Sequence, residues 1–160
     1  MALAVVLAAA ALVVAVIGLV REPAQPATSS SNTSTLNTNT EAADRSLCRA
    51  IAPMMKEGDD RAKAFVNLGH TGTPERDAGI TQFVTDTRTW ADRVQQDLDQ
   101  YAQPGRFLTR TLQRYIDDLR LYVASIRPGP STKYDDAAWT DSLVAYGGPL
   151  SRCQELGVTW

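Results

Sequence analysis

Two cysteines and a single histidine are the residues of this sequence best suited to chemistry. Cys48 and Cys153 are its only cysteines and His70 is its only histidine, set in a glycine-rich, loop-like stretch. These three side chains are too few for a usual four-ligand structural zinc site. A Cys48–His70 nucleophile pair is chemically conceivable, but a solvated loop histidine is the simpler interpretation of His70. We therefore expect no catalytic residues, no metal and no cofactor.

The positions of the two cysteines suggest a different role for them. Cys48 and Cys153 lie near the two ends of the region that we expect to fold. An even pair that brackets a domain indicates a disulfide formed in an oxidising compartment. The alternative is a pair of unrelated buried thiols in a reducing cytoplasm. The disulfide is the favoured interpretation, and it would leave no free thiol for catalysis.

Acidic side chains cluster at three places, 57–60, 117–118 and 135–136. Paired carboxylates can carry out acid–base catalysis or bind calcium, but none of these clusters has the spacing of an EF-hand loop. Helix capping and solvated helix faces explain them. The sequence also contains no phosphate-binding loop, dinucleotide-binding glycine motif or nucleophile-elbow motif.

Three arginines form the most distinctive charge pattern. Arg106, Arg110 and Arg114 recur at steps of four and therefore share one face of a helix. Such a stripe could bind lipid headgroups, an anionic envelope polymer or an acidic partner helix. The favoured alternative is internal pairing with the acidic residues of the preceding helix, namely Asp92, Asp97 and Asp99.

Two central helices are predicted by hydrophobic periodicity and by end signals. The first runs from about Pro74 to Ala102, with Thr73 as its N-cap. The second runs from about Arg106 to Ile126 and carries a heptad seam typical of helix–helix packing. Because a short Pro-Gly loop joins them, we expect an antiparallel hairpin. The seam residues are Leu108, Leu112, Tyr115, Leu119, Tyr122 and Ile126.

Two outer helices should complete a four-helix bundle. The first carries an apolar face that includes Leu47, Cys48 and Ile51, and we expect Pro53 to kink or break it. The last should begin at Asp135 or Asp136 and be interrupted at residues 147–149. We expect its apolar face to comprise Trp139, Leu143, Val144 and Tyr146.

The start of the chain predicts a membrane anchor. Residues 2–20 are uninterruptedly apolar and Arg21 follows them, so the segment 1–21 is long enough to cross a bilayer. A cleaved signal peptide is the alternative, but the run exceeds the usual apolar region of about 7–15 residues and lacks a preceding basic residue. Residues 22–41 are rich in Ser, Thr, Pro and Asn, which predicts a flexible tether. Residues 42–160 should form the folded domain.

Composition limits the classes of partner and of source. A net charge of −2 does not favour nucleic-acid binding. Arginine greatly outnumbers lysine and alanine is abundant, which suggests a bacterial genome or a phage of such a host. With the disulfide outside the cell, the domain should be extracytoplasmic and the anchor single-pass in the cell membrane, in contact with lipid through residues 2–20.

The sequence thus predicts an all-α protein with a transmembrane helix, a tether and an up-and-down four-helix bundle linked by one disulfide. Its expected function is that of a binding or scaffolding protein of a bacterial cell envelope, an accessory subunit that contacts an envelope protein partner. The alternatives are a ligand-sensing bundle that acts through a separate membrane partner, a phage-encoded envelope protein and, third, an enzyme. A closed core would favour scaffolding. A pocket lined by Tyr115, Tyr122 and Trp90 would favour ligand binding, and a polar cleft gathering His70 with carboxylates would favour an enzyme.

Overall fold

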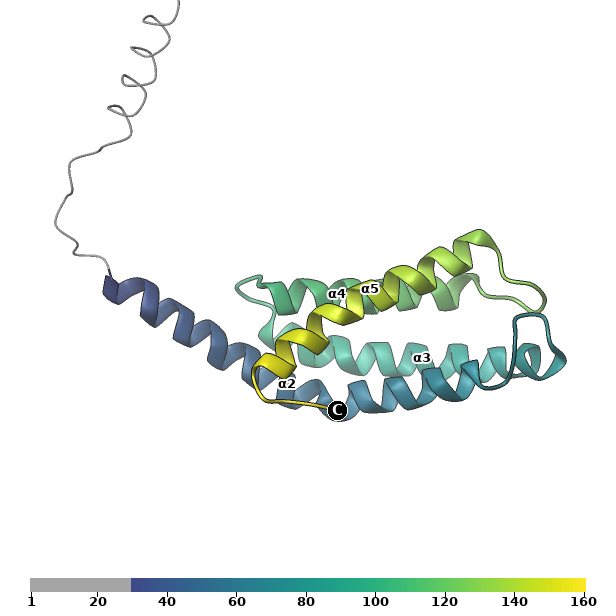
Figure 1. Ribbon diagram of the computed structural model, residues 1–160, viewed down its shortest axis with the longest axis horizontal. Helices are drawn as coiled ribbons and strands as arrows, with labels where there is room; N and C mark the ends of the chain where they lie inside the picture. The colour runs from purple at the N-terminus through teal and green to yellow at the C-terminus, as the bar shows by residue number, and fades with distance from the viewer. Residues whose placement is uncertain (1–29) are drawn as a thin grey trace, which may run out of the picture. The chain divides into compact units, whose positions relative to one another are not determined.

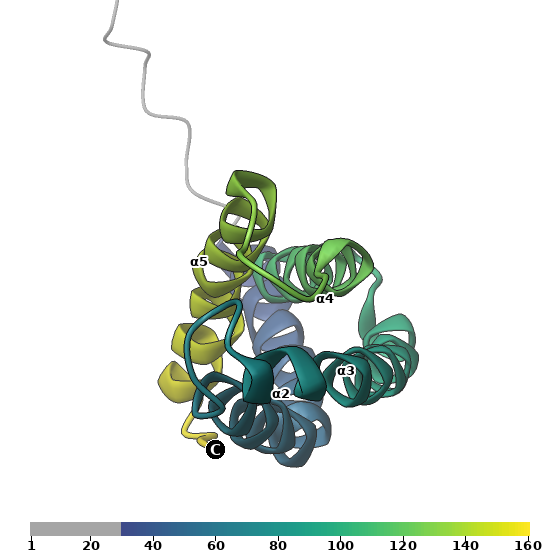
Figure 2. The same ribbon diagram turned by 90° about the vertical axis from the view of Figure 1, so that its right-hand side faces the viewer.

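The computed structural model describes the backbone of residues 30–160 and the side chains of residues 39–160. Its four helices are α2 (Ser30–Val66), α3 (Pro74–Tyr101), α4 (Phe107–Ser125) and α5 (Lys133–Glu155). Consecutive helices run in opposite directions (Figure 1), and the view from one end shows them around a common core (Figure 2). The predicted four-helix, all-α bundle is confirmed for this part of the chain. Within it, no helix has the length and apolar character needed to cross a bilayer. The predicted anchor, residues 1–21, lies outside the described residues.

The central hairpin forms as its sequence pattern predicts. Thr73 occupies the N-cap position of α3 with extended backbone angles, and Pro74 is the first helical residue. In α4, Ile116 and Val123 are buried beside all six residues of the heptad seam. The seam therefore packs inward, and α4 contacts both α3 and α5.

Helix α2 departs from the prediction at two places. It is already helical at Ser30, within the stretch 22–41 for which the sequence predicts a flexible tether, and residues 22–29 lie outside the described residues. Extending an existing helix adds one hydrogen bond per ordered residue, whereas starting one is costly. Of the kink or break predicted at Pro53, the break is absent, because the helix continues through this residue. Ile51 and Met55 are buried on either side of Pro53, and their packing offsets the lost backbone bond.

Helix α5 likewise begins earlier and runs further than predicted. Thr132, rather than Asp135 or Asp136, is its N-cap, and Asp135 completes a capping box with Thr132. The Ser125 hydroxyl donates a hydrogen bond to Asp135 at 2.6 Å and lowers the pKa of that carboxyl. The expected interruption at residues 147–149 is absent, since Gly148 and Pro149 lie buried within the continuous helix.

The buried face of α5 consists of small residues. Leu143 and Val144, predicted on this face, are 53% and 65% exposed. A Cβ atom added at Gly148 would lie only 2.4 Å from the Thr111 side chain of α4. Small side chains allow two helix backbones to approach closely, so α5 packs tightly on α4. The small buried residues are Ala138, Ser142, Ala145 and Gly148.

The disulfide predicted from the sequence is formed. The Cys48 and Cys153 Cα atoms lie 5.4 Å apart, and the bond joins α2 to α5 across 105 positions of the chain. Both cysteines belong to the larger of two buried clusters, which also contains Trp90, Leu112 and Ile116. The smaller cluster lies toward the α4–α5 loop and consists of Phe65, Phe83, Tyr122, Val123, Ile126 and Ala138.

Replacing Leu112 with alanine tests whether the heptad seam carries the core. Leu112 is fully buried, so we expect Leu112→Ala to lower the free energy of unfolding by about 2–5 kcal/mol. Leu121→Ala is the matched control, because Leu121 lies on the same helix and is 61% exposed. Its effect should be within about 0.5 kcal/mol. Denaturant unfolding measures both, and equal losses would contradict this assignment of the core.

Removing the disulfide tests its contribution to stability. The Cys48→Ala/Cys153→Ala double variant should lose about 2–5 kcal/mol of unfolding free energy, because the unfolded chain regains the freedom of a long closed loop. A reductant should destabilise the wild type by a similar amount and leave the double variant unchanged. Insensitivity of the wild type to complete reduction would contradict the expectation.

Candidate functional site

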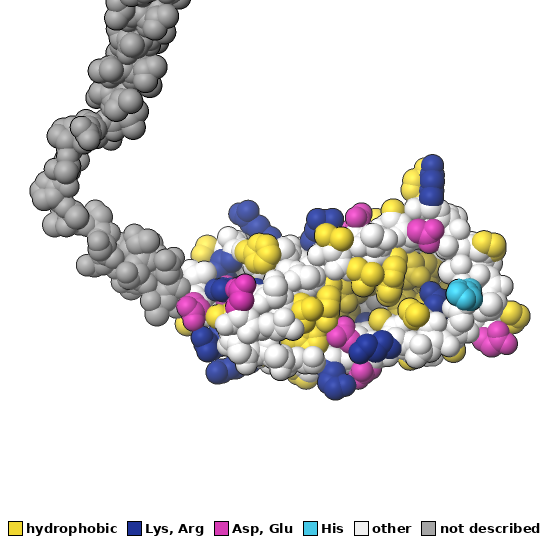
Figure 3. Space-filling model, in the orientation of Figure 1, with side chains coloured by type: hydrophobic (Ala, Val, Ile, Leu, Met, Phe, Trp, Pro, Cys, Tyr) yellow, Lys and Arg dark blue, Asp and Glu magenta, His cyan; other side chains and the backbone are white. Residues whose placement is uncertain are grey.

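A groove runs between α2 and α5, and residues of α3 and α4 complete its lining. Figure 3 shows hydrophobic side chains gathered in a hollow there, with the single histidine at one end. The hollow has an inner compartment of about 380 Å³ beside the middle of α5 and an outer compartment of about 300 Å³ near the α2–α3 and α4–α5 loops. Val66 and Trp139 line both compartments, so we treat them as one aromatic groove.

The inner compartment is mainly apolar. Its walls come from all four helices and combine large apolar side chains with small residues. Gly58 and Ala62 of α2 and Ser142 of α5 leave the space open. The apolar lining comprises Val66, Phe83, Tyr115, Leu119, Trp139 and Leu143.

A hydrogen-bonded chain crosses from α5 to α2 beside the inner compartment. The Trp160 indole N–H donates to the Tyr146 hydroxyl at 2.8 Å, and that hydroxyl donates to Asp59 Oδ2 at 2.8 Å. Burial raises the pKa of Tyr146 to about 12. The Tyr146 hydroxyl therefore stays protonated at neutral pH and keeps α5 bonded to α2 here.

Two polar groups of the inner compartment retain bonding capacity. Arg61 donates from Nε to the Thr87 hydroxyl at 3.2 Å, and its guanidinium lies 5.0 Å from the centre of the Trp90 ring. No carboxylate pairs with Arg61 in the described part of the chain. Tyr115 is only 7% exposed, and its hydroxyl has no hydrogen-bond partner among the described residues. Burial lowers the pKa of Arg61 and raises that of Tyr115.

The outer compartment is more polar. Arg76 stacks on the Phe65 ring at 3.7 Å and donates to the Phe65 carbonyl oxygen. Asp77 accepts a hydrogen bond from the Gly129 N–H, while its second oxygen is buried without a partner in the described residues. His70 is exposed at the rim. The ionisable lining residues are His70, Arg76, Asp77, Arg127, Asp135 and Asp136.

The described residues do not bring together the catalytic pairs that the sequence suggested. Cys48 is disulfide-bonded, so a Cys48–His70 nucleophile pair does not form. The carboxyl of Asp135 is engaged in capping α5, and the His70 side chain has no hydrogen bond or ion pair within residues 39–160. No three potential metal ligands come together among the described residues. The expectation of no metal and no catalysis stays a prediction.

The predicted arginine stripe is not a continuous exposed surface. Arg106 precedes α4 with extended backbone angles and is buried, so the four-residue spacing does not place it with the others. Arg114 pairs with Asp118 and Asp141 at 3.4 Å and 3.8 Å. The predicted pairing of the stripe with Asp92, Asp97 and Asp99 is therefore wrong, and Asp92 pairs instead with Arg120. Arg110 is exposed without an ion pair among the described residues, and a partner-binding role for the three arginines remains untested.

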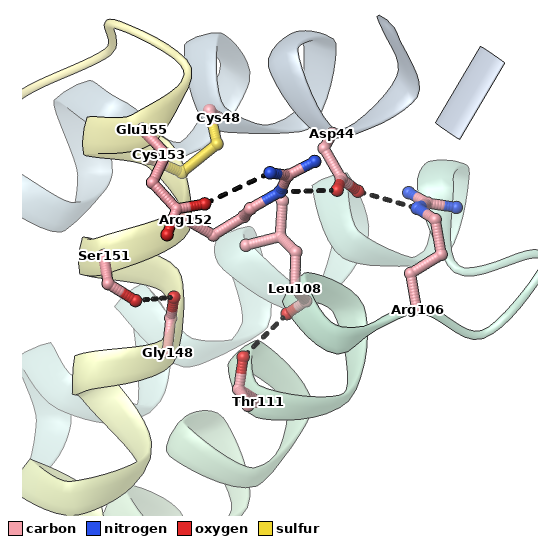
Figure 4. The surroundings of a disulfide bond; sticks show 10 residues. All are labelled: Asp44, Cys48, Arg106, Leu108, Thr111, Gly148, Ser151, Arg152, Cys153 and Glu155. Carbon is pink, nitrogen blue, oxygen red and sulfur yellow. Dashed lines mark hydrogen bonds and ion pairs between the residues drawn. A yellow bond between two sulfur atoms is a disulfide. The ribbon is translucent and has the colours of Figure 1, made fainter. Parts of the chain in front are cut away.

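Arg106 instead belongs to a buried charge cluster near the disulfide. Figure 4 shows Asp44 between two guanidinium groups. Its carboxylate accepts from Arg106 Nε at 2.7 Å and from Arg152 Nε at 3.0 Å. Arg106 also donates to the carbonyl oxygens of Pro104 and Tyr101. The cluster thus joins α2, the α3–α4 loop and α5, and its role is structural.

Sequence reasoning identified part of the groove and missed its charged component. Tyr115 and Tyr122 line it as the pocket hypothesis requires, but Trp90 is fully buried and donates to the Met54 carbonyl oxygen at 2.7 Å. Trp139, rather than Trp90, is the tryptophan that lines the groove. The sequence analysis did not identify Arg61. This residue lies seven positions after Met54, a spacing of two helical turns that places it on the apolar face of α2. A charged residue at such a position is the signal that could have found it.

Truncating Asp44 tests the structural role of the buried cluster. Asp44→Ala leaves the Arg106 guanidinium buried beside Arg152 without its carboxylate, so we expect a loss of about 3–5 kcal/mol in unfolding free energy. Asp92→Ala is the control, because Asp92 pairs with Arg120 at the surface. It should cost at most about 1 kcal/mol. Thermal or denaturant unfolding measures both, and a near-neutral Asp44→Ala would contradict the assignment.

Comparisons with known proteins give no family for this chain. A scan against protein-family models, a search of curated proteins and a search of solved structures each found no match. Its function is therefore inferred from the sequence and from the residues of the aromatic groove.

Proposed function

We propose that this chain is a membrane-anchored, extracytoplasmic binding protein of a bacterial cell envelope, and that its bundle holds a small, largely apolar ligand in the aromatic groove. The observation that carries the proposal is the inner compartment of about 380 Å³, lined by aromatic and aliphatic side chains. Sites for small molecules have this size and lining, with a few polar groups that orient the ligand.

The groove favours ligand binding over pure scaffolding. A bundle whose only task is to present its surface gains stability by filling its core, because unfilled apolar space forfeits packing energy. Here Tyr115, Leu119 and Trp139 border an open hollow instead. This arrangement supports the ligand-binding alternative of the sequence analysis above the scaffolding one.

The location within the envelope is supported by the sequence and by the disulfide. The apolar segment 1–21 has the length and composition of a single transmembrane helix. The Cys48–Cys153 bond suits an oxidising compartment outside the cytoplasm. Together they support an anchored domain outside the membrane, where a bound molecule would be held at the cell surface.

A scaffolding role remains the second candidate, because several large apolar side chains of α4 and α5 face solvent. Phe107, Leu121 and Val144 are each more than 60% exposed. Exposed apolar residues that recur on neighbouring helices suit contact with another protein. Such a partner could bind this surface while the groove holds its ligand.

Filling the groove tests the proposed function. Ala62 lines the inner compartment, so Ala62→Phe should occupy the ligand space and reduce the binding of an apolar probe about tenfold or more. Ala64→Phe is the matched control, because Ala64 is exposed on the same helix and outside the groove. Binding of naphthylethanol to the full-length chain in nanodiscs is measured by fluorescence anisotropy, with empty nanodiscs subtracted.

The wild type and Ala64→Phe should bind this probe alike. Wild-type chain that does not bind it, or that binds it no better than Ala62→Phe, would overturn the groove as a ligand site. The melting temperature of each variant confirms that the bundle remains folded.

A further inference from the structure

The inner compartment contains a polar corner formed by Arg61 and Tyr115, which both contact the Trp90 ring. The guanidinium lies 5.0 Å from the centre of the Trp90 ring, and the Tyr115 ring meets the same ring edge to face with centroids 5.7 Å apart. Both side chains line the compartment. Arg61 comes from α2 and Tyr115 from α4, so the helical framework fixes the two groups relative to each other.

Both groups of the corner can still donate hydrogen bonds. The only hydrogen bond of the Arg61 side chain within the described residues uses Nε, so its two Nη groups are free to donate. The Tyr115 hydroxyl has no hydrogen-bond partner within the same residues, and Tyr115 lines the inner compartment. A guanidinium fork and a phenol are the donors that proteins use for planar carboxylates.

The nearby acids are hydrogen-bonded to other groups, and Glu57 and Asp86 act on Arg61 only through longer-range attraction. Asp86 accepts a hydrogen bond from Gln82. Glu57 is paired with Arg93, and Asp59 accepts the hydrogen bond of Tyr146. Asp59 also lies close enough to raise the pKa of Tyr115 further, beyond the effect of burial. Its negative charge disfavours a doubly charged anion in the corner, whereas a singly charged carboxylate can be matched by the one guanidinium.

We propose that the ligand of the aromatic groove is a small monocarboxylate with an aromatic or otherwise apolar body, and that Arg61 and Tyr115 bind its carboxylate. The inference rests on the proposed function. The apolar lining of the inner compartment takes the body, with Phe83, Leu119 and Trp139 as its neighbours. The carboxylate supplies the anionic partner that Arg61 lacks in the described part of the chain.

Matched probes that differ only in their polar group test this assignment. Naphthylacetate, naphthylethanol and naphthyl phosphate are titrated against the full-length chain in zwitterionic nanodiscs, and fluorescence anisotropy gives each affinity. We expect naphthylacetate to bind about 10- to 100-fold more tightly than naphthylethanol, because a hydrogen-bonded charge adds to the apolar contact. Naphthyl phosphate should bind more weakly than naphthylacetate.

Variants locate the effect at the polar corner. Arg61→Gln should weaken naphthylacetate binding about 10- to 100-fold, and Tyr115→Phe about 3- to 10-fold, while naphthylethanol binding stays unchanged in both. Arg88→Gln is the charge-matched control, since Arg88 is exposed on α3 and outside the groove. Because Arg61 also packs on Trp90, melting temperatures are compared. Tyr115→Phe, which removes one hydroxyl, decides the test if Arg61→Gln does not fold.

The possible failures are distinguishable. If neither naphthylethanol nor naphthylacetate binds the wild type, the groove itself is not a ligand site and the proposed function fails. If the two probes bind with equal affinity, and neither Arg61→Gln nor Tyr115→Phe changes either affinity, the groove remains a ligand site. The inference that it binds a carboxylate is then overturned. Tighter binding of naphthyl phosphate than of naphthylacetate would also overturn it, by assigning the corner to phosphate esters such as lipid headgroups.

Discussion

Helix α5 is fixed to α2 mainly near its C-terminal end, and the shape of the bundle follows from this attachment. The Cys48–Cys153 bond and the ion pair between Asp44 and Arg152 hold the two helices together there. The small residues of α5 seat it against α4, as the close approach of Gly148 to Thr111 illustrates. Figure 1 shows α5 diverging from α2 toward the α4–α5 loop. The aromatic groove occupies the space that this divergence opens.

The groove stays open because several residues of its lining are too small to fill it. A side chain at Gly58 would approach the Trp90 ring to 3.2 Å, so the packing of Trp90 itself favours glycine at this position. Ala62 and Ser142 leave room beside the larger side chains of Tyr115 and Leu119 in the same lining. The hydrogen bond from Tyr146 to Asp59 holds the helices at a fixed separation beside the compartment. Core packing and the open site are therefore built by the same residues.

Hydrophobic spacing was sufficient to predict the central helices but not how the outer helices pack. The heptad seam of α4 is buried as expected because large residues at regular steps leave few alternatives. In α5, the large apolar residues Leu143 and Val144 were predicted on the buried face. Contact with α4 instead requires small residues such as Ala145. Pro53 and Pro149 were expected to interrupt helices, yet tertiary contacts on both sides keep each helix continuous. Arg61 and Asp44 lie on apolar helix faces, and this position is visible in the sequence. The residues with which they bond are defined only by the fold.

Arg61 differs from the other buried or interhelical arginines in what surrounds it. Arg106 and Arg152 share Asp44, and Arg120 reaches Asp92 on the neighbouring helix. Arg61 has a hydroxyl and an aromatic face but no counter-ion in the described residues, and burial lowers its pKa. Contact with Trp90 alone would be satisfied by an apolar side chain that carries no cost of desolvation. A guanidinium at the wall of an apolar compartment is most favourable when an anion enters with its own apolar body, because the entering molecule then covers the aromatic lining and supplies the missing charge.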